Sequence, residues 1–352
     1  MSEASNAGGR GRDPRTAERR ERRVGDGLAE LDQWLRDQVA HGLARAERAP
    51  YRLWDDASRR LVDASAGSLA AHVKALAGVP RRTGWPERLL AEYALLRLLV
   101  RAYQGRDALP PRLREIVRAR IGFTMPHDDV LAHGESVHDT WCVIGARDTT
   151  LDQLTTRRVW LRGAESGRSA LVLSFAARGR PLDASLKVGA HVDAVLAFYP
   201  DGLRALVAER SRRSGPRRPG SPRAGAAQAG AAQAGATQAG ATQAGATQAG
   251  ARRAPGGTSV RGLLDEYAEA LAGDPWLDRW PAVLAQVRPA RDERGDLHVL
   301  DADGDALPVR TGDPWPLLAV SGGGPVTLSG EWTPDGLHPL ALWHPEEGVV
   351  LL

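Results

Sequence analysis

Cysteine is almost missing from this chain of 352 residues, since Cys142 is the only one. No intrachain disulfide can form, and no zinc site built on several cysteines can be assembled. Cys142 stands between Trp141 and Val143 in an apolar run. This setting indicates a buried small side chain, because an activated thiolate needs accessible, electropositive surroundings.

Long apolar runs are missing as well. The best one, residues 89–100, is interrupted by Glu92 and Arg97 and falls short of the ~18 residues that a membrane span needs. Residues 1–23 are polar and rich in Arg, without the apolar region of a secretory signal. With the low cysteine content, this predicts a cytoplasmic protein that makes no membrane contact.

Acidic residues are absent from residues 210–253, which carry eight Arg, and residues 1–23 carry seven Arg against four acids. Together these two segments carry a charge of +11. Because the net charge of the whole chain is +4, the remaining residues sum to −7. A cationic nucleic-acid face on the folded part is therefore disfavoured. Weak nucleic-acid binding is expected only from the basic segments, through Arg19, Arg20, Arg22, Arg23, Arg212, Arg213, Arg217 and Arg218.

After a disordered basic tail at 1–23, residues 24–134 are predicted to be helical. Apolar residues recur every three or four positions along Val24–Leu43, and the period continues through 54–61 and 69–76. Pro86 and Pro111 suit the first turns of two further helices. The first of these carries one apolar face, made of Leu89, Tyr93, Leu96, Val100 and Tyr103. Short loops predict a bundle or helical array.

Residues 135–209 are predicted to form an antiparallel β module, because short runs of Val, Leu and aromatic residues alternate with Gly, Pro and Asp. The predicted strands are 140–146, 158–162, 170–176, 191–199 and 204–209, with a hairpin loop at Gly163–Gly167. Residues 210–257 are predicted to be a disordered linker, since their Ala/Gly/Gln repeat offers nothing bulky to bury.

Residues 258–352 are predicted to hold short helices and a C-terminal β module. One helix is expected at 263–271 and another from Asp274–Trp276, where Asp is the cap and Pro the first-turn residue. Strands are expected at 297–300, 306–310, 317–320, 326–331 and 340–343. They form either an independent barrel or a continuation of the first sheet. The fold class is therefore α+β.

Three segments resemble ligand sites without matching them. One is a polar stretch with His127, Asp128, Asp129, His133, Glu135 and His138, but its last two histidines are five residues apart around Gly134, whereas zinc hydrolases need two His one helical turn apart. Asp301–Asp305 resembles half a calcium loop, yet Ala306 and Gly312 occupy positions that need Gly and Glu. Ser321–Gly324 lacks the Lys of a phosphate-binding loop. We therefore expect connections and turns, and no catalytic, cofactor or metal residues.

Tryptophan is unusually frequent, with ten against three Phe. Most of these residues lie in apolar runs and are expected in the core, while exposed ones would mark a binding surface. The candidates for an interaction surface are Trp276, Trp280, Trp315 and Trp332.

Several phrases of the sequence resemble the body of actinobacterial SWIM zinc-finger family proteins. They are AELDQWLRDQ (29–38), GWPERLL (84–90), LTTRRVWLRG (154–163), ALVLSFA (170–176), DPWLDRWP (274–281), DADGDAL (301–307), GDPWPLLAVSGG (312–323) and GEWTPDGL (330–337). The similarity runs from about Thr16 to the end and spares the repeat. Fingers of that family bind zinc through a C-x-C…C-x-H set ahead of this body, which these residues do not contain. Zinc would be expected only if that finger were present.

The resemblance also implies a setting beside AAA-type ATPases and von Willebrand A-type proteins, and hence a protein partner of one of these kinds. We expect a non-enzymatic binding or scaffolding protein, an accessory of a protein assembly. The alternatives are a nucleic-acid-binding accessory that acts through the Arg-rich tails and an unrecognised enzyme. No converging nucleophile, base or metal set supports the enzyme.

Overall fold

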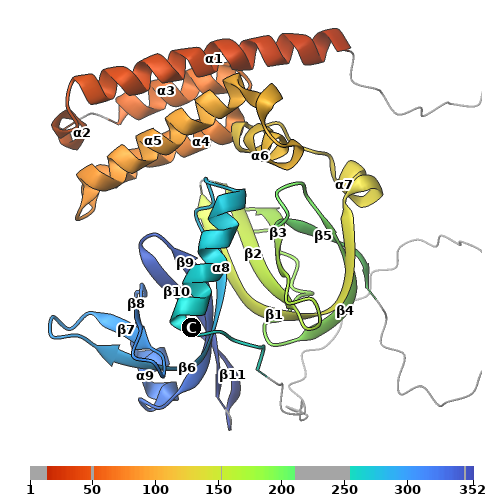
Figure 1. The fold of residues 1–352 in the computed structure, drawn as a ribbon, viewed down its shortest axis with the longest axis vertical. Helices are drawn as coiled ribbons and strands as arrows, with labels where there is room; N and C mark the ends of the chain where they lie inside the picture. Colours follow the sequence, from red (N-terminus) through yellow and green to blue (C-terminus); the bar gives the residue numbers. More distant parts are fainter. Residues whose placement is uncertain (1–13, 49–50, 152, 211–253, 345) are drawn as a thin grey trace, which may run out of the picture.

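The chain folds as an α+β protein, with a helical bundle at one end and two antiparallel sheets at the other (Figure 1). The structure is a computed structural model that describes residues 14–48, 51–151, 153–210, 254–344 and 346–352. The helical part comprises α1 (Pro14–Ala40), α2 (Ala44–Arg48), α3 (Arg52–Asp63), α4 (Gly67–Ala75), η1 (Leu76–Arg81), α5 (Trp85–Gln104), η2 (Arg106–Ala108), α6 (Pro111–Ile121) and α7 (His127–His133). The first sheet comprises β1 (Glu135–Leu151), β2 (Leu154–Gly163), β3 (Ser169–Ala177), β4 (His191–Phe198) and β5 (Ala205–Arg210). The C-terminal part comprises α8 (Val260–Gly273), β6 (Trp280–Arg291), β7 (Leu297–Leu300), β8 (Ala306–Pro308), α9 (Trp315–Ser321), β9 (Val326–Thr333), β10 (Gly336–His344) and β11 (Gly348–Leu351).

The predicted helical stripes form the core of the bundle. All five residues of the predicted apolar face of α5 are buried, and the stripe of α1 is buried from Val24 to Leu35. Val39 is exposed because α1 ends one residue later. Burial of each large apolar side chain contributes about 1.5–3 kcal/mol, so packing stabilises these helices more than helix propensity does.

Helix α1 begins at Pro14, which corrects the expected disorder of residues 14–23. The first turns are tied to the rest of the bundle. Arg20 donates to the carbonyl of Gly122 at 2.9 Å, and Arg118 donates to the carboxylate of Glu21 at 2.6 Å. A charged composition is compatible with order here because individual charges have partners on α6 and the loop after it.

The first sheet has the strand order β3-β2-β1-β4-β5 and is antiparallel throughout. The five predicted strands are confirmed, and so is the hairpin between β2 and β3. The backbone N–H of Leu171 donates to the carbonyl of Leu203 at 2.8 Å beside a parallel bridge to Arg204. The two edge strands therefore meet at that point, and the sheet curls around its own core (Figure 1).

The second sheet has the order β11-β10-β9-β6-β7-β8. Two expectations were wrong here. Residues 317–320, predicted as a strand, lie in helix α9, which directs Leu317 into the core. Asp274–Trp276 form a turn rather than a helix: the Asp274 side chain accepts from the N–H of Trp276 at 3.1 Å, and β6 begins soon after at Trp280.

The two sheets pack against each other through a shared apolar core. Cys142, Ile144 and Trp160 of the first sheet meet Leu340 and Trp343 of β10, among others. The contact is so close that a Cβ on Gly145 would lie 2.5 Å from Cδ1 of Leu340. The C-terminal strands thus neither continue the first sheet nor stand apart from it, but cover its outer face.

Most of the predicted linker, residues 211–253, lies outside the described residues. At its two ends the prediction needs a correction, because Arg210 is the last residue of β5 and Pro255 is buried. Within the described ranges, no helix has the length and apolar character required to cross a membrane.

Candidate functional site

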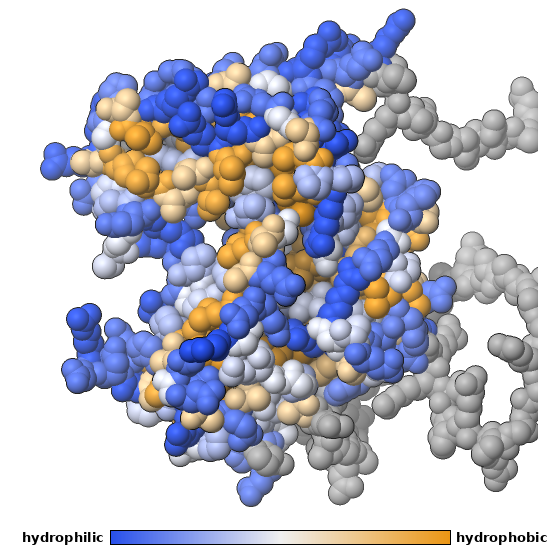
Figure 2. Space-filling view, in the orientation of Figure 1, coloured by the Kyte–Doolittle hydropathy of each residue, from blue (hydrophilic) through white to orange (hydrophobic). Residues whose placement is uncertain are grey.

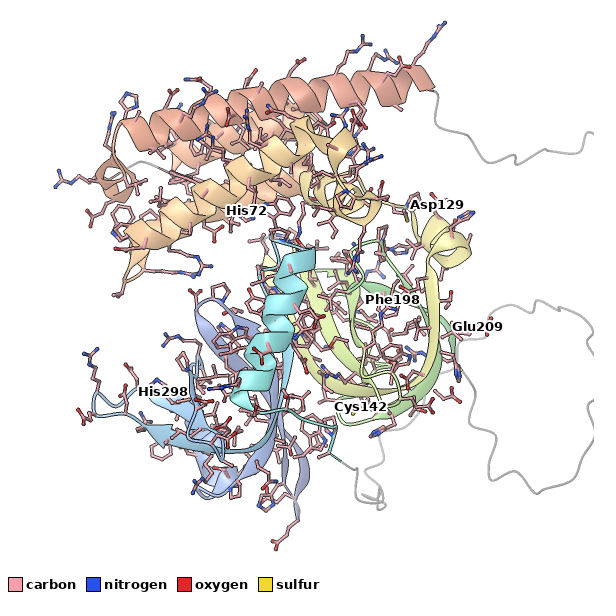
Figure 3. All side chains as sticks on the ribbon, in the orientation of Figure 1. His72, Asp129, Cys142, Phe198, Glu209 and His298 are labelled. Carbon is pink, nitrogen blue, oxygen red and sulfur yellow. The ribbon has the colours of Figure 1, made fainter. Side chains whose placement is uncertain are left out.

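The polar stretch between His127 and Asp139 is divided between two elements. Residues 127–133 form α7, at the junction where Figure 3 labels Asp129, and the rest begins β1. His138 bonds to Asp193 through Nε2 at 2.6 Å. The described part of the chain contains no group of three His, Cys, Asp or Glu residues that could hold a metal ion.

Two further carboxylates organise turns. Oδ2 of Asp139 accepts from the backbone N–H of Ser166 at 2.9 Å and closes the β2–β3 hairpin. Asp301 accepts from the N–H of Asp305 at 3.0 Å, and from the N–H of Val260 at 2.9 Å. The segment that resembles half a calcium loop is therefore the turn between β7 and β8, and it also orients the start of α8.

Cys142 lies in the core between the sheets (Figure 3). Burial raises the pKa of its thiol to about 11. The thiol is thus protonated near neutral pH, and its surroundings do not favour the nucleophilic thiolate.

The four candidate tryptophans have different surroundings. Trp276 packs against the core of the bundle and donates from Nε1 to the carbonyl of Leu95 at 2.9 Å. Trp280 and Trp332 face each other across β6 and β9 and pack against the core of the second sheet. Trp315 alone of the four is largely open, with 69% of its surface exposed.

Four of the candidate nucleic-acid contacts lie on α1. Arg19, Arg22 and Arg23 are exposed. Arg20 points inward, with its guanidinium 4.5 Å from the centre of the Phe123 ring. Arg212, Arg213, Arg217 and Arg218 lie outside the described residues.

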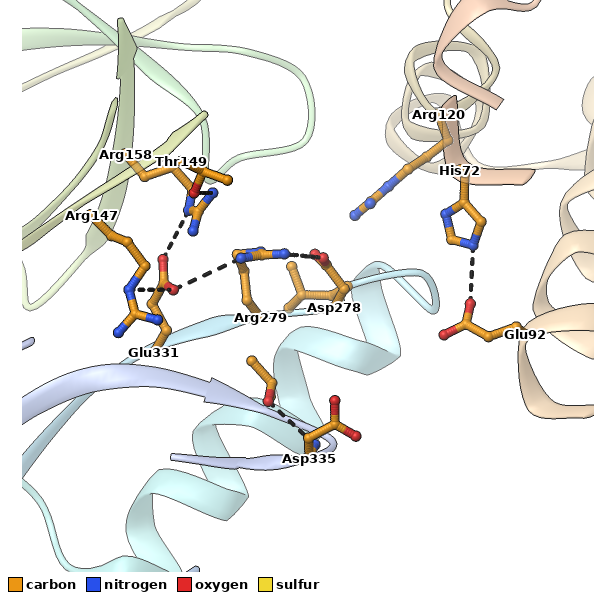
Figure 4. A network of polar contacts seen from close by, with 12 residues as sticks. His72, Glu92, Arg120, Arg147, Thr149, Arg158, Asp278, Arg279, Glu331 and Asp335 are labelled. Atoms are coloured by element: carbon orange, nitrogen blue, oxygen red, sulfur yellow. Dashed lines mark hydrogen bonds and ion pairs between the residues drawn. The ribbon is translucent and has the colours of Figure 1, made fainter. Parts of the chain in front are cut away.

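A polar cluster surrounds Glu331 of β9, which is only 1% exposed. Trp160 Nε1 and Arg158 Nε each donate to Oε1, at 2.9 and 3.0 Å. Arg147 Nε and a terminal nitrogen of Arg279 lie 3.6 and 3.8 Å from Oε2 (Figure 4). Trp160, Arg158 and Arg147 belong to the first sheet and Glu331 to the second, so this carboxylate joins the sheets electrostatically as the apolar core joins them by packing.

The cluster keeps Glu331 ionised. Burial by itself raises the pKa of the carboxyl group, but the hydrogen bonds from Arg158 and Trp160 and the charges of Arg158 and Arg279 outweigh it. The pKa therefore lies below its ordinary value. A carboxylate held this firmly is a poor proton carrier, and the arrangement favours a structural role.

The C-terminal part also holds the bundle at two points. Arg120 of α6 donates to Asp274 at 2.6 Å, beside the partly buried contact of Trp276 with α5. Near the start of α5, Arg88 donates to Asp335 of the β9–β10 turn at 2.6 Å. The bundle is thereby held against the C-terminal part by contacts with α6 and with two positions on α5.

The side of α5 that points away from the bundle core is apolar and open. Leu90 and Leu98 are 47% and 46% exposed, and Ala94 between them is exposed as well. Since residues four apart share one side of a helix, these three form a single row. Figure 2 shows hydrophobic atoms gathered in a band across the bundle where α5 lies. We call these three residues the α5 outer row.

Comparison with known families bears on this helical part. Residues 19–121 match the SWIM-associated four-helix bundle domain. The match reaches from the first turns of α1 to the end of α6 and supports a relationship to SWIM-associated proteins. The search of curated proteins found no match to the chain, and neither did the search of solved structures. We refer to residues 19–121 as the SWIM-associated bundle.

The α5 outer row was not predicted from the sequence, although a signal for it exists. Between Leu89 and Val100, α5 carries apolar residues on every side, interrupted by Glu92 and Arg97. A helix that is apolar all round is normally surrounded by protein or lipid. Here one side of α5 faces solvent. The apolar residues on every side of this helix are the sequence signal that could have identified the α5 outer row.

Proposed function

We propose that the chain is a non-enzymatic binding and scaffolding protein of the cytoplasm, which docks an amphipathic helix of a protein partner on the α5 outer row. The observation that carries the proposal is the exposed row Leu90, Ala94 and Leu98 on a helix whose other side fills the bundle core. An apolar surface of this kind, held on a rigid element, is typical of partner binding.

The geometry of the row favours a helix as the bound element. Rows of side chains four apart form ridges that fit the grooves of a second helix, and a small residue such as Ala94 lets the two axes approach closely. Arg97 and Arg101 are exposed beside the row, three residues after Ala94 and Leu98 respectively, and Arg97 also lies 3.3 Å from Asp32 of α1. The partner helix should therefore carry Leu or Ile at a spacing of four and acidic residues along one flank.

The resemblance to SWIM zinc-finger family proteins suggests which partners to test first, namely an AAA-type ATPase or a von Willebrand A-type protein. It also leads us to propose that the chain acts without a zinc finger of its own, because a single cysteine cannot provide the ligand set of that finger.

The test places a photo-crosslinking amino acid at Leu98 in cells of the native organism and identifies the captured protein. Its affinity for the full chain is then measured with the wild type, with Leu98→Asp and with a matched control, Leu151→Asp. Leu151 is an exposed leucine at the end of β1, in the first sheet and not in the bundle. Loss of one buried leucine corresponds to about 1.5–3 kcal/mol, so Leu98→Asp should weaken binding at least tenfold. Unchanged binding by Leu98→Asp, or crosslinking only to a second copy of the chain, would refute the proposal.

A second candidate function, nucleic-acid binding, is favoured by the exposed face of Arg19, Arg22 and Arg23 on α1. Replacing all three by Gln should lower the slope of log affinity against log salt by about 3 if each contacts a phosphate. Substitution is preferable to deletion, because Glu21 and Val24 of the same helix contact the bundle. An unchanged slope for binding to duplex DNA would exclude α1 as the contact surface.

A further inference from the structure

A cavity of about 640 Å³ lies at one edge of the second sheet, where β1 of the first sheet approaches it. Residues distant in sequence line it: Arg147, Arg291, Gly295, Asp296, Leu297, Val309, Arg310, Thr311, Gly312, Pro314, His338, Pro339 and Leu352. Its volume falls within the ~300–1,000 Å³ typical of sites for small molecules. Polar groups and prolines share the wall with Leu297 and Val309, so the cavity combines an apolar part with a charged one.

Three guanidinium groups supply the charge, and backbone carbonyls hold each in place. Arg147 donates to the carbonyl of Pro339 at 3.1 Å, and Arg291 donates to that of Gly295 at 2.7 Å. Arg310 donates from Nε to the carbonyl of Asp335 at 2.6 Å. A carbonyl fixes the side chain without cancelling its charge, and a guanidinium has five N–H donors, so donors remain for a ligand.

Basic side chains outnumber acidic ones in the wall of the cavity. Among the described residues, Asp296 is the one acidic side chain there, against three Arg. Glu331 lies 3.6 Å behind Arg147, but it is shared with Arg158 and Arg279. Burial, and next the charge of Arg147, hold the pKa of His338 below its ordinary value. His338 is therefore a neutral imidazole near pH 7 and can donate or accept one hydrogen bond.

We propose that this cavity binds a small molecule that carries at least two negative charges on oxygen atoms, as a phosphate ester or a diphosphate does. The planar fork of Arg suits both phosphate and carboxylate groups, and dicarboxylates share this chemistry. The site lies on the sheets and is independent of the α5 outer row, so the two proposals stand or fall separately.

The experiment titrates the full chain with inorganic pyrophosphate and, in a second arm, with citrate, by calorimetry at low ionic strength. The variants are Arg291→Gln and Arg310→Gln, both at exposed residues, so the fold should be retained. Arg294→Gln is the matched control, because Arg294 is exposed in the same β6–β7 turn but is absent from the wall.

We expect saturable binding of pyrophosphate by the wild type and by Arg294→Gln, and at least a tenfold weaker affinity in the other two variants. Tighter binding of citrate than of pyrophosphate would assign the site to carboxylates within the same proposal. Absence of saturation by either anion up to about 10 mM, which corresponds to a binding free energy weaker than about −3 kcal/mol, would overturn the proposal. An equal loss in Arg294→Gln would overturn it as well, because it would indicate a general effect of charge.

Discussion

Replacement of Glu331 by Gln tests how firmly the two sheets are joined. The substitution keeps the shape and leaves an oxygen that can accept from Trp160 Nε1, but it removes the charge that Arg158, Arg147 and Arg279 share. Breaking a buried ion pair at one side costs about 3–5 kcal/mol, because the partner charge stays buried without compensation.

The structure places the expected cost at the lower end of that range. The side chains of Arg147 and Arg279 are 32% and 30% exposed, so water can solvate them in part. Arg279 also keeps its ion pair with Asp278 at 2.7 Å. We therefore expect Glu331→Gln to lower the free energy of unfolding by about 3 kcal/mol, and the melting temperature by roughly 5 °C.

Urea unfolding at pH 7, followed by tryptophan fluorescence and by circular dichroism, measures this loss. Glu135→Gln is the control, since Glu135 pairs with Arg168 through both of its carboxylate oxygens but at the surface, with 63% of its side chain exposed. Exposed pairs contribute at most about 1 kcal/mol. If Glu331→Gln costs no more than this control, the assignment of Glu331 as the electrostatic joint of the sheets is refuted.

Three further outcomes are expected. Because the folded-state pKa of Glu331 lies below its ordinary value of 4.5, its contribution to stability is present above pH 4.5 and disappears as the pH falls through the lowered pKa; stability measured from pH 6 to pH 3 should fall less steeply in Glu331→Gln than in the wild type. Elemental analysis of the purified chain should find less than about 0.1 zinc per chain, and about one zinc per chain would redirect attention to His127, His133 and His138. A chain cut at a protease site introduced within residues 211–253 should stay associated and unfold in one transition, because the core that contains Ile144, Trp160 and Leu340 spans the cut; two separately melting fragments would contradict this.

The helical half of the fold could be predicted from the sequence because its signals are local. The stripe of α5 from Leu89 to Tyr103 has the period of a helix, and all its predicted core residues are buried. By contrast, a short apolar run such as residues 317–320 fits a strand and a buried helix equally well by periodicity. Leu317 packs in the core of the second sheet, and this packing favours the helix α9. The other residues of that core are far away in sequence.

Strand β6 illustrates a different limit. It contains Pro281 and Pro289, which argue against a central strand because proline cannot donate a hydrogen bond to a neighbour. In the structure, β6 pairs with β9 up to Val287 and with β7 only from Arg288 on. Each proline therefore lies where β6 has a neighbour on one side only. The sequence shows the prolines but not this change of partner.

The arginine-lined cavity could not be predicted at all from linear spacing. Its three guanidinium groups are at positions 147, 291 and 310: Arg147 lies within β1, Arg291 ends β6, and Arg310 follows β8. Only the packing of one sheet across the other brings them to one wall. Trp276 illustrates the opposite case. From the sequence it is a candidate for an interaction surface with a partner, but in the structure it packs against the bundle of the same chain.

The way the second sheet covers the first has a consequence for biosynthesis. Trp160 and its partner Glu331 are 171 residues apart, and Ile144 and Ser329, which share a hydrogen bond, are 185 apart. At about 5–20 residues per second, a ribosome takes roughly 10–35 s to synthesise the residues between the first sheet and the strands of the second sheet that pack on it. The bundle, whose contacts are local, folds on a much shorter timescale. Each nascent chain therefore presents a finished bundle and a first sheet with Cys142, Ile144 and Trp160 still facing water, and nascent-chain chaperones have that interval in which to bind it.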